Sequence, residues 1–291
     1  MPELPEVHAL VADLRGRLVG RRIARLDIVA FAALKTYDPP VSALEGSTVA
    51  AVDRHGKFLD ITATTSGDAE LHLVVHLARA GWLRWREKTP LATVKRGAGP
   101  IAARLVLDDG SGFDLTEAGT KKSLAIHVTR DPQSVERVAT LGPDPLAESF
   151  TEAVFAGILA AAGRAQIKGV LRDQRLIAGI GNAYSDEILH VAKMSPFKPA
   201  SMEAADVHVL YEAVQTTLRE AVARSEGLAA SELKGEKKSN LRVHGRFGQP
   251  CPVCGDTVKQ VVYADSTFQY CPTCQTGGKP LADRVLSRLL K

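Results

Sequence analysis

Four cysteines place the tightest constraint on how this chain can fold. They form two pairs, Cys251 with Cys254 and Cys271 with Cys274, and 16 residues lie between the pairs. This is the spacing of a four-cysteine zinc site, because each pair brings two thiolates to one point and tetrahedral Zn²⁺ accepts four. The sequence therefore predicts one structural zinc ion with no open coordination position.

Residues 258–263 and 267–270, between the cysteine pairs, are predicted to form a β-hairpin. A redox-active pair is the alternative, but it is typical of a strand–helix–strand unit, which this region lacks. No apolar run approaches the about 20 residues of a membrane-spanning helix, and the N-terminus carries no signal-peptide pattern. We therefore expect a cytoplasmic protein without membrane contact, a setting in which disulfides are rare.

The first half of the chain changes from one helix to a series of short strands. Apolar residues recur at helical spacing over residues 7–19. The predicted strands are residues 22–29, 49–52, 58–61, 71–76, 101–107, 112–115 and 124–128, with turn residues such as 53–56 between them. This order predicts a β-sandwich with the helix packed outside it. Residues 87–100 contain two prolines and two glycines, so we expect a mobile loop there.

The second half is predicted to be helical, beyond a rigid link at residues 141–146. The expected helices are residues 151–162, 165–173, 183–192 and 203–225. Between the second and third of them, Gly179 and Gly181 let the backbone approach a partner closely, and Asn182 is predicted to cap the next helix. A helix N-terminus offers N–H groups to a phosphate, which Lys168 and Asn182 could flank. The alternative is an ordinary helix–turn–helix core element.

A basic segment, residues 234–246, precedes the first cysteine pair. It carries lysines and arginines, has few apolar residues, and lies in a chain whose net charge is +4. It could be a solvated linker or a phosphate-contacting strand and loop. The adjoining zinc hairpin favours the second interpretation.

The first six residues predict a reactive chain end. Methionine before proline is normally removed, which would leave Pro2 with a secondary amine whose unperturbed pKa is roughly 7.7–8. Such an amine attacks an aldehyde carbon and forms an iminium ion, and Glu3 and Glu6 are near enough for acid/base roles. A rigid, charged start to a helix is the alternative.

Together these segments resemble the formamidopyrimidine-DNA glycosylase / endonuclease VIII (Fpg/Nei) family over nearly the whole chain. The matching segments are residues 1–6, 55–59, 179–187 and 245–275, in the order of the family. The resemblance implies an α+β fold: a β-sandwich catalytic domain at residues 1–140, a helical helix–two-turns–helix domain at 141–245, and a zinc finger with a tail at 246–291. It also implies a nucleoid-associated protein of a bacterial-type cytosol.

The resemblance further implies a glycosylase that flips a damaged base out of DNA and cleaves the strand at the abasic site. Pro2 matches the nucleophile that attacks C1′ of the sugar, and Glu3 matches the acid/base residue. Glu6 matches a supporting carboxylate. Lys57 matches a lysine that holds the phosphate beside the lesion, although a solvated turn lysine is the alternative.

Other matching residues are expected to contact DNA from the second half of the chain. They are Lys168, Asn182, Tyr184 and Arg246. The implied partner is damaged or abasic duplex DNA, bound by a monomer that holds one structural Zn²⁺.

The departures from the family pattern fall where the lesion is read. Arg79 stands where a methionine is usual, and residues 114–122 lack the usual Arg-Phe wedge pair. Asp265 or Ser266 stands where the zinc hairpin usually has an arginine. Residues 227–240 do not match the loop that closes over oxidised guanine in some members. We therefore expect an altered preference, toward abasic sites or single-stranded or unusual lesions.

Two other functions are consistent with parts of this pattern. A non-catalytic or lyase-only damaged-DNA-binding protein would explain the missing wedge pair and hairpin arginine. A zinc-ribbon interaction protein unrelated to repair would explain the cysteines, but it leaves the other three matching segments unexplained.

Overall fold

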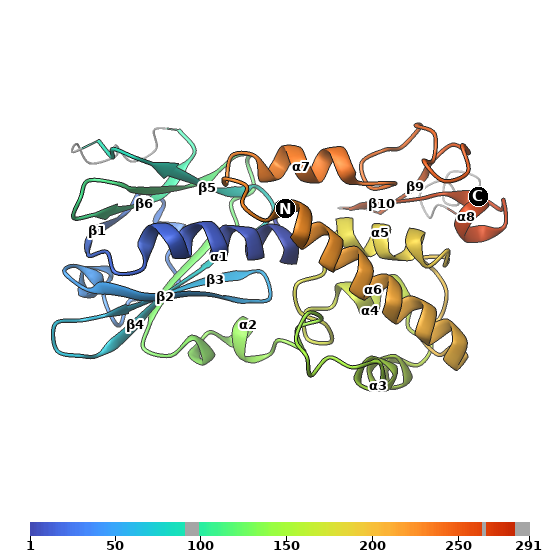
Figure 1. Cartoon of the computed structure of the whole chain (residues 1–291), viewed down its shortest axis with the longest axis horizontal. Helices are drawn as coiled ribbons and strands as arrows, with labels where there is room; N and C mark the ends of the chain where they lie inside the picture. The colour runs from blue at the N-terminus through green and yellow to red at the C-terminus, as the bar shows by residue number, and fades with distance from the viewer. Residues whose placement is uncertain (91–98, 264–265, 283–291) are drawn as a thin grey trace. The chain divides into compact units, whose positions relative to one another are not determined.

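The computed structural model describes residues 1–90, 99–263 and 266–282. The chain divides into two compact units, Met1–Leu141 with Ser225–Leu233, and Gly142–Arg224 with Lys234–Lys291 (Figure 1). The first unit thus contains the residues of the predicted sandwich domain and, in addition, the segment Ser225–Leu233. The cysteine pairs lie in the same unit as the helices. Among the described residues, no helix is long and apolar enough to cross a membrane.

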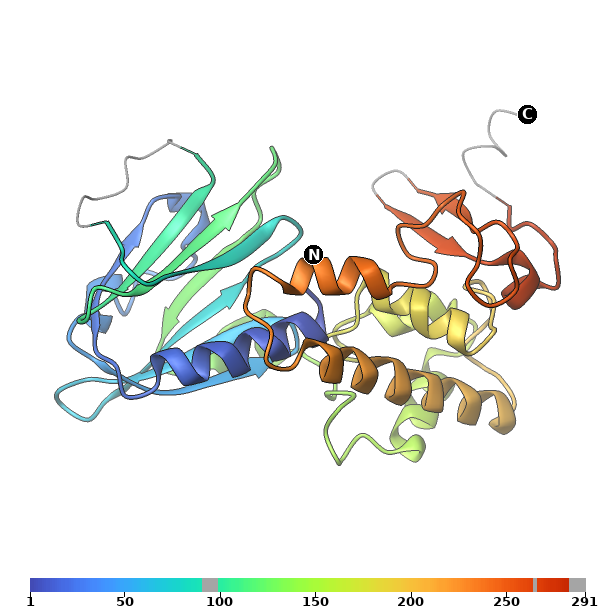
Figure 2. The ribbon, with the colours of Figure 1, turned by 45° about the horizontal axis from the view of Figure 1, so that its top comes forward.

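The first unit contains one long helix and two four-stranded antiparallel sheets (Figure 2). One sheet has the order β2-β3-β4-β8 and the other β1-β6-β7-β5. The elements are α1 (Leu4–Leu18), β1 (Ile23–Ile28), β2 (Thr48–His55), β3 (Phe58–Thr64), β4 (Glu70–His76), β5 (Gly81–Arg86), β6 (Ile101–Leu107), β7 (Gly112–Glu117) and β8 (Ala125–Thr129). Apolar side chains from α1 and both sheets share one core. The predicted α+β class with an N-terminal β-sandwich is confirmed.

Two details of the sandwich differ from the prediction. Strand β2 does not end at Val52 but runs through His55, which pairs with Phe58, so the turn is confined to Gly56 and Lys57. Gly56 adopts a φ of +54°, which glycine tolerates without steric cost. Strand β5 was not predicted, because its arginines hide the alternation of a strand. One of them, Arg86, is paired with Asp114 on β7 at 2.9 Å.

Short helices complete the first unit. They are the 3₁₀ helices η1 (Phe31–Ala33), η2 (Val41–Leu44) and η3 (Pro132–Ser134), and the helix α2 (Glu136–Ala139). Val135 and Val138 at α2 bury against Phe58 and Val74 of β3 and β4 in a small second core. The segment Ser225–Leu233 returns to the sandwich, where Leu233 is buried in the main core.

The second unit is helical, with a two-stranded sheet at its C-terminal end. Its elements are α3 (Glu152–Ala162), α4 (Ile167–Arg172), α5 (Asn182–Val191), α6 (Ala204–Ser225), α7 (Leu233–Asn240), β9 (Lys259–Val262), β10 (Thr267–Tyr270) and α8 (Pro272–Thr276). Strands β9 and β10 form the predicted hairpin between the cysteine pairs. The basic segment 234–246 is not a strand, because its first part forms α7. Glu236 anchors this helix through a 2.9 Å contact with Arg224 of α6.

Candidate functional site

The N-terminal turn holds two buried carboxylates directly beside Pro2. Glu3 is the N-cap of α1, and its backbone N–H donates to Glu6 Oε2 at 2.8 Å. The Glu3 side chain accepts in return from the backbone N–H of Glu6, which completes a capping box. Glu3 is 2% exposed and Glu6 1% exposed. The start of α1 therefore places Glu3 next to the predicted nucleophile. The Glu6 carboxylate holds the backbone of Glu3 by accepting its N–H group.

Lys57 lies on the β2–β3 turn, which a buried carboxylate supports from β3. Asp60 accepts hydrogen bonds from His55 Nε2 at 2.9 Å and from His72 Nδ1 at 3.0 Å. Burial raises the pKa of Asp60, but the two histidine hydrogen bonds outweigh it and lower that pKa below its usual value. The hydrogen bond to Asp60 raises the pKa of His72. This network, absent from the prediction, fixes the strand ends that carry Lys57.

The turn before α5 gives Lys168 buried partners and corrects the predicted capping role of Asn182. The Lys168 ammonium is buried and bonds to Asp186 Oδ1 at 2.6 Å, to Ser185 Oγ at 2.7 Å and to the Asn182 carbonyl at 3.3 Å. Its donors thus have internal partners that the sequence did not predict, and the phosphate contact of Lys168 stays a prediction. Asn182 does not cap α5. Gly181 is the N-cap, and Asn182 Nδ2 donates to the Thr267 carbonyl of β10 at 2.7 Å.

Two adjacent carboxylates of α5 join the helices to the C-terminal segment. Asp186 Oδ2 accepts from His244 Nδ1 at 2.6 Å and from the Gln269 N–H at 3.1 Å. Glu187 accepts the backbone N–H groups of residues 242–244 at 2.6 to 3.0 Å. Burial raises the pKa of Glu187, and these N–H groups oppose the shift. Two adjacent acidic residues in a helix that is mostly buried were the sequence signal for this junction, and it was missed.

Substituting Asp186 with Asn is expected to destabilise the protein by about 3–5 kcal/mol, because the buried Lys168 ammonium loses its counter-charge. Lys168 is 4% exposed and Asp186 fully buried. The matched control is Asp206→Asn, whose partner Lys198 and carboxylate are both partly exposed. We expect that control to cost less than about 1 kcal/mol. Urea unfolding measures both, and equal losses would contradict a special role for the buried pair.

Tyr184 and Arg246 lie in the second unit with defined partners. Tyr184 is 2% exposed, and the Lys237 ammonium of α7 lies 4.6 Å from the centroid of its ring. Arg246 is half-buried and donates from Nε to Gln249 Oε1 at 3.1 Å and from Nη1 to the Leu241 carbonyl at 3.3 Å. Tyr184 thus supports a lysine of α7 that belongs to the basic segment 234–246.

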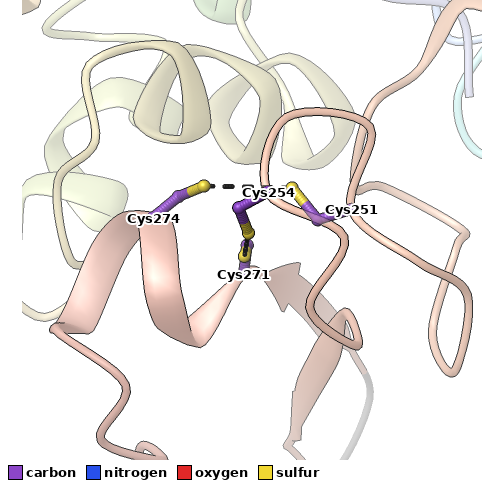
Figure 3. Close-up of side chains that lie close together, drawn as sticks. All are labelled: Cys251, Cys254, Cys271 and Cys274. Atoms are coloured by element: carbon purple, nitrogen blue, oxygen red, sulfur yellow. Dashed lines mark hydrogen bonds between the residues drawn. The ribbon is translucent and has the colours of Figure 1, made fainter.

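The four cysteines meet at one point, as predicted (Figure 3). Their sulfur atoms all lie within 4.8 Å of one another, and the Cys254–Cys271 and Cys251–Cys274 separations are 3.4 and 3.9 Å. Zn–S bonds of about 2.3 Å in a tetrahedron place sulfur atoms about 3.8 Å apart, so this donor set fits one zinc ion. His190 of α5 adds an outer contact, with Nε2 at 3.3 Å from Cys251 Sγ.

The thiols of this cluster differ in acidity when no metal is bound. Burial raises the pKa of Cys271 to about 11 and also raises the pKa of Cys274. A backbone hydrogen bond from Asp256 lowers the pKa of Cys254. A metal must therefore displace protons from the buried thiols, which makes its affinity increase with pH.

The segments that depart from the family pattern are only partly covered by the structure. Asp265 and residues 91–98 of the predicted mobile loop lie outside the described residues. Glu117 Oε1 links the two ends of the segment at residues 118–122, because it accepts hydrogen bonds from the N–H groups of Ser123 and Leu124 at 2.7 and 3.0 Å. Part of segment 227–240 is anchored in the first unit, where Trp82 Nε1 donates to the Ala230 carbonyl at 3.0 Å.

Comparison with known protein families defines the class of this two-unit chain. Residues 1–123 match the formamidopyrimidine-DNA glycosylase N-terminal domain, and residues 141–232 match the formamidopyrimidine-DNA glycosylase H2TH domain. The formamidopyrimidine-DNA glycosylase of Thermus thermophilus is 34% identical over 288 residues, and the match covers 96% of this chain and 100% of that protein. The chain therefore belongs to the formamidopyrimidine-DNA glycosylase (Fpg/Nei) family.

Other relatives and solved structures agree with this assignment. An uncharacterized formamidopyrimidine-DNA glycosylase-like protein of Mycobacterium tuberculosis is 60% identical over 152 residues, 52% of this chain and 94% of that protein. The structure of Thermus thermophilus MutM (Fpg) has a TM-score of 0.78 at 32% identity, covering 96% of this chain and all of that one. The Lactococcus lactis enzyme bound to DNA with an abasic (AP) site has a TM-score of 0.79 at 26% identity, covering 94% and 99%.

Proposed function

We propose that this protein is a base-excision repair DNA glycosylase with abasic-site lyase activity, which acts through Pro2 on oxidised or abasic sites. The observation that carries the proposal is the N-terminal turn beside Pro2. There Glu3 and Glu6 are buried, and the side chain of each accepts a hydrogen bond from the backbone N–H of the other. Family relatives that carry the glycosylase name, and one solved with abasic-site DNA, support the same function.

In the proposed reaction the chain end supplies the nucleophile. Once Met1 is removed, the lone pair of the Pro2 nitrogen forms a bond to C1′ of the deoxyribose. The bond from C1′ to the base breaks, its electron pair leaves with the base, and the base takes up the proton that the Pro2 nitrogen loses. Glu3 protonates the ring oxygen, so the sugar opens and leaves an iminium ion on Pro2. The iminium acidifies C2′, and Glu3, now a carboxylate, takes that proton while the C3′–O bond breaks and its electron pair leaves with the 3′ phosphate. Water then releases the sugar from Pro2.

The remaining candidate residues bind DNA or maintain the fold in this proposal. Lys57 holds the phosphate beside the lesion, and Asn182, Tyr184 and Arg246 belong to the DNA contacts of the second unit. Lys168 acts indirectly, since its ammonium holds Asp186 and the start of α5. Through their four sulfurs, the cysteines hold one structural Zn²⁺. The partner is damaged or abasic duplex DNA, bound by a cytoplasmic monomer.

Borohydride trapping on DNA with an abasic site tests the proposal. We expect a covalent protein–DNA adduct from protein that intact mass shows to begin at Pro2, because the reductant fixes the iminium ion. Oligonucleotides with different lesions, scored for base release and for strand nicking, then separate glycosylase from lyase activity. Absence of any adduct from the Met-trimmed protein would contradict the proposal.

A second candidate, a damaged-DNA binder that is non-catalytic or only a lyase, rests on the changes at the lesion-reading positions. Arg79 replaces the usual methionine, and Ser266 is one of the two residues at the place of the usual hairpin arginine. Tight, salt-dependent binding to abasic DNA without base release would favour this candidate.

A further inference from the structure

Three side chains on one face of α5 reach the C-terminal segment that holds the cysteines. Asn182, Asp186 and His190 follow one another at intervals of four residues, the spacing that aligns side chains along a helix. The first two bond to the backbone of strand β10. The third, His190, has its Nε2 atom 3.3 Å from Cys251 Sγ. This row of contacts therefore ends on one of the four predicted zinc ligands.

The surroundings of His190 select one form of its imidazole ring. His190 is 2% exposed, and its Nδ1 has no hydrogen-bond partner among the residues that the structure describes. A neutral imidazole carries its proton on one of its two nitrogens. A proton on Nδ1 would leave a buried N–H group without an acceptor, and the Nε2 lone pair would face the sulfur. A proton on Nε2 lets the ring donate to Cys251 Sγ, so this form satisfies more of the buried polar groups.

The Cys251 sulfur gains from a hydrogen-bond donor when it binds a metal. Four thiolates carry more negative charge than one Zn²⁺ neutralises, and Cys251 is only 3% exposed to water. A buried charge costs free energy unless hydrogen bonds compensate it. Cys254 and Cys271 each receive a backbone hydrogen bond from within the C-terminal segment. His190 is placed to serve Cys251 in the same way, but from α5, outside that segment.

We infer that His190 donates a hydrogen bond from Nε2 to the zinc-bound thiolate of Cys251, and thereby strengthens the metal site and joins it to α5. The inference rests on the zinc ion of the proposed function. His190 is a positioning residue in this role, because it contacts a ligand of the metal and not the metal itself. Groups that hydrogen-bond to metal ligands typically contribute roughly 10–100-fold to metal affinity.

Competition with a zinc chelator measures the contribution of His190 to metal affinity. His190→Phe keeps an aromatic ring and removes the donor, so we expect zinc to bind roughly 10–100-fold more weakly. His190→Gln is the conservative variant, because its amide N–H can take the place of the Nε2 donor, and it should retain most of the affinity. His190→Leu repeats the measurement with a smaller apolar side chain, should the phenylalanine variant not fold.

Tyr270→Phe is the matched control for general destabilisation of the C-terminal segment. Tyr270 is buried and precedes Cys271 in the chain, and its hydroxyl oxygen accepts from the Leu281 N–H at 2.7 Å. The substitution removes a buried hydrogen bond of the same segment without altering a contact to sulfur. We therefore expect it to keep the zinc affinity of the wild-type protein. Equal losses of affinity in Tyr270→Phe and His190→Phe would overturn the inference.

Substitution of Co²⁺ for zinc adds a spectroscopic readout of the hydrogen bond itself. A donor lowers the energy of the sulfur lone pair, so its loss in His190→Phe should move the thiolate-to-cobalt charge-transfer band to longer wavelength. The band should keep its position in Tyr270→Phe and in His190→Gln. A band at the wild-type position in His190→Phe would overturn the role of His190 and leave the zinc site intact. If the wild-type protein takes up neither zinc nor cobalt, the zinc ion of the proposed function fails and this inference fails with it.

Discussion

Glu3→Gln is expected to lower the rate of base release and strand cleavage by about 10²–10⁴-fold, the usual contribution of a general acid/base. The amide cannot give a proton to the sugar oxygen, whereas the Pro2 amine remains intact. Glutamine keeps an oxygen that accepts the Glu6 N–H, so the capping box and the fold should survive. Single-turnover kinetics on a lesion duplex, with borohydride trapping in parallel, measures the loss.

Glu6→Gln is the matched control for this prediction, because Glu6 is buried in the same capping box. Its side chain accepts the Glu3 N–H at 2.8 Å, a contact that a glutamine oxygen can also make. We expect a much smaller loss of rate from this variant. Undiminished trapping and turnover by Glu3→Gln, with a melting temperature like that of the wild-type protein, would exclude Glu3 as the acid/base residue.

The parts of the molecule that were predictable from sequence depend on near neighbours in the chain. The four zinc-binding candidates lie within one short segment, so their spacing alone predicts the cluster that the sulfur positions confirm. Strand β6 was predicted at its observed bounds because its apolar run is bordered by turn residues. Strand β5 was missed because the carboxylate that pairs with the charge of Arg86 belongs to Asp114, 28 residues further along the chain.

The contacts of the candidate site that the sequence did not show have the same physical origin. Lys168 was predicted to hold a phosphate, since a lysine beside a glycine-rich turn gives no sign of a buried partner. Its counter-charge, Asp186, lies on the next helix, and the ion pair exists only once α4 and α5 pack together. A pattern within one element cannot show a site assembled from several.

Cys254→Ser is expected to remove the zinc ion and to loosen the end of the second unit. Three thiolates rarely hold a structural zinc ion, and the folding of such a small module depends on its metal. Cys254 is exposed, so the substitution removes a ligand without disturbing a packed core. Metal analysis should show less than a full equivalent of zinc, and the melting temperature should fall by roughly 10 °C.

The loss should extend to DNA binding, because the zinc segment is bonded to the start and the middle of α5. The Thr267 carbonyl accepts from Asn182, and the Gln269 N–H donates to Asp186. Val253→Ser is the matched control, since it introduces serine at an exposed position of the same cysteine pair and removes no sulfur. We expect that variant to keep its zinc and its affinity for abasic DNA. A full equivalent of zinc in Cys254→Ser would instead show that the ligand set is wrong, whatever happens to the affinity.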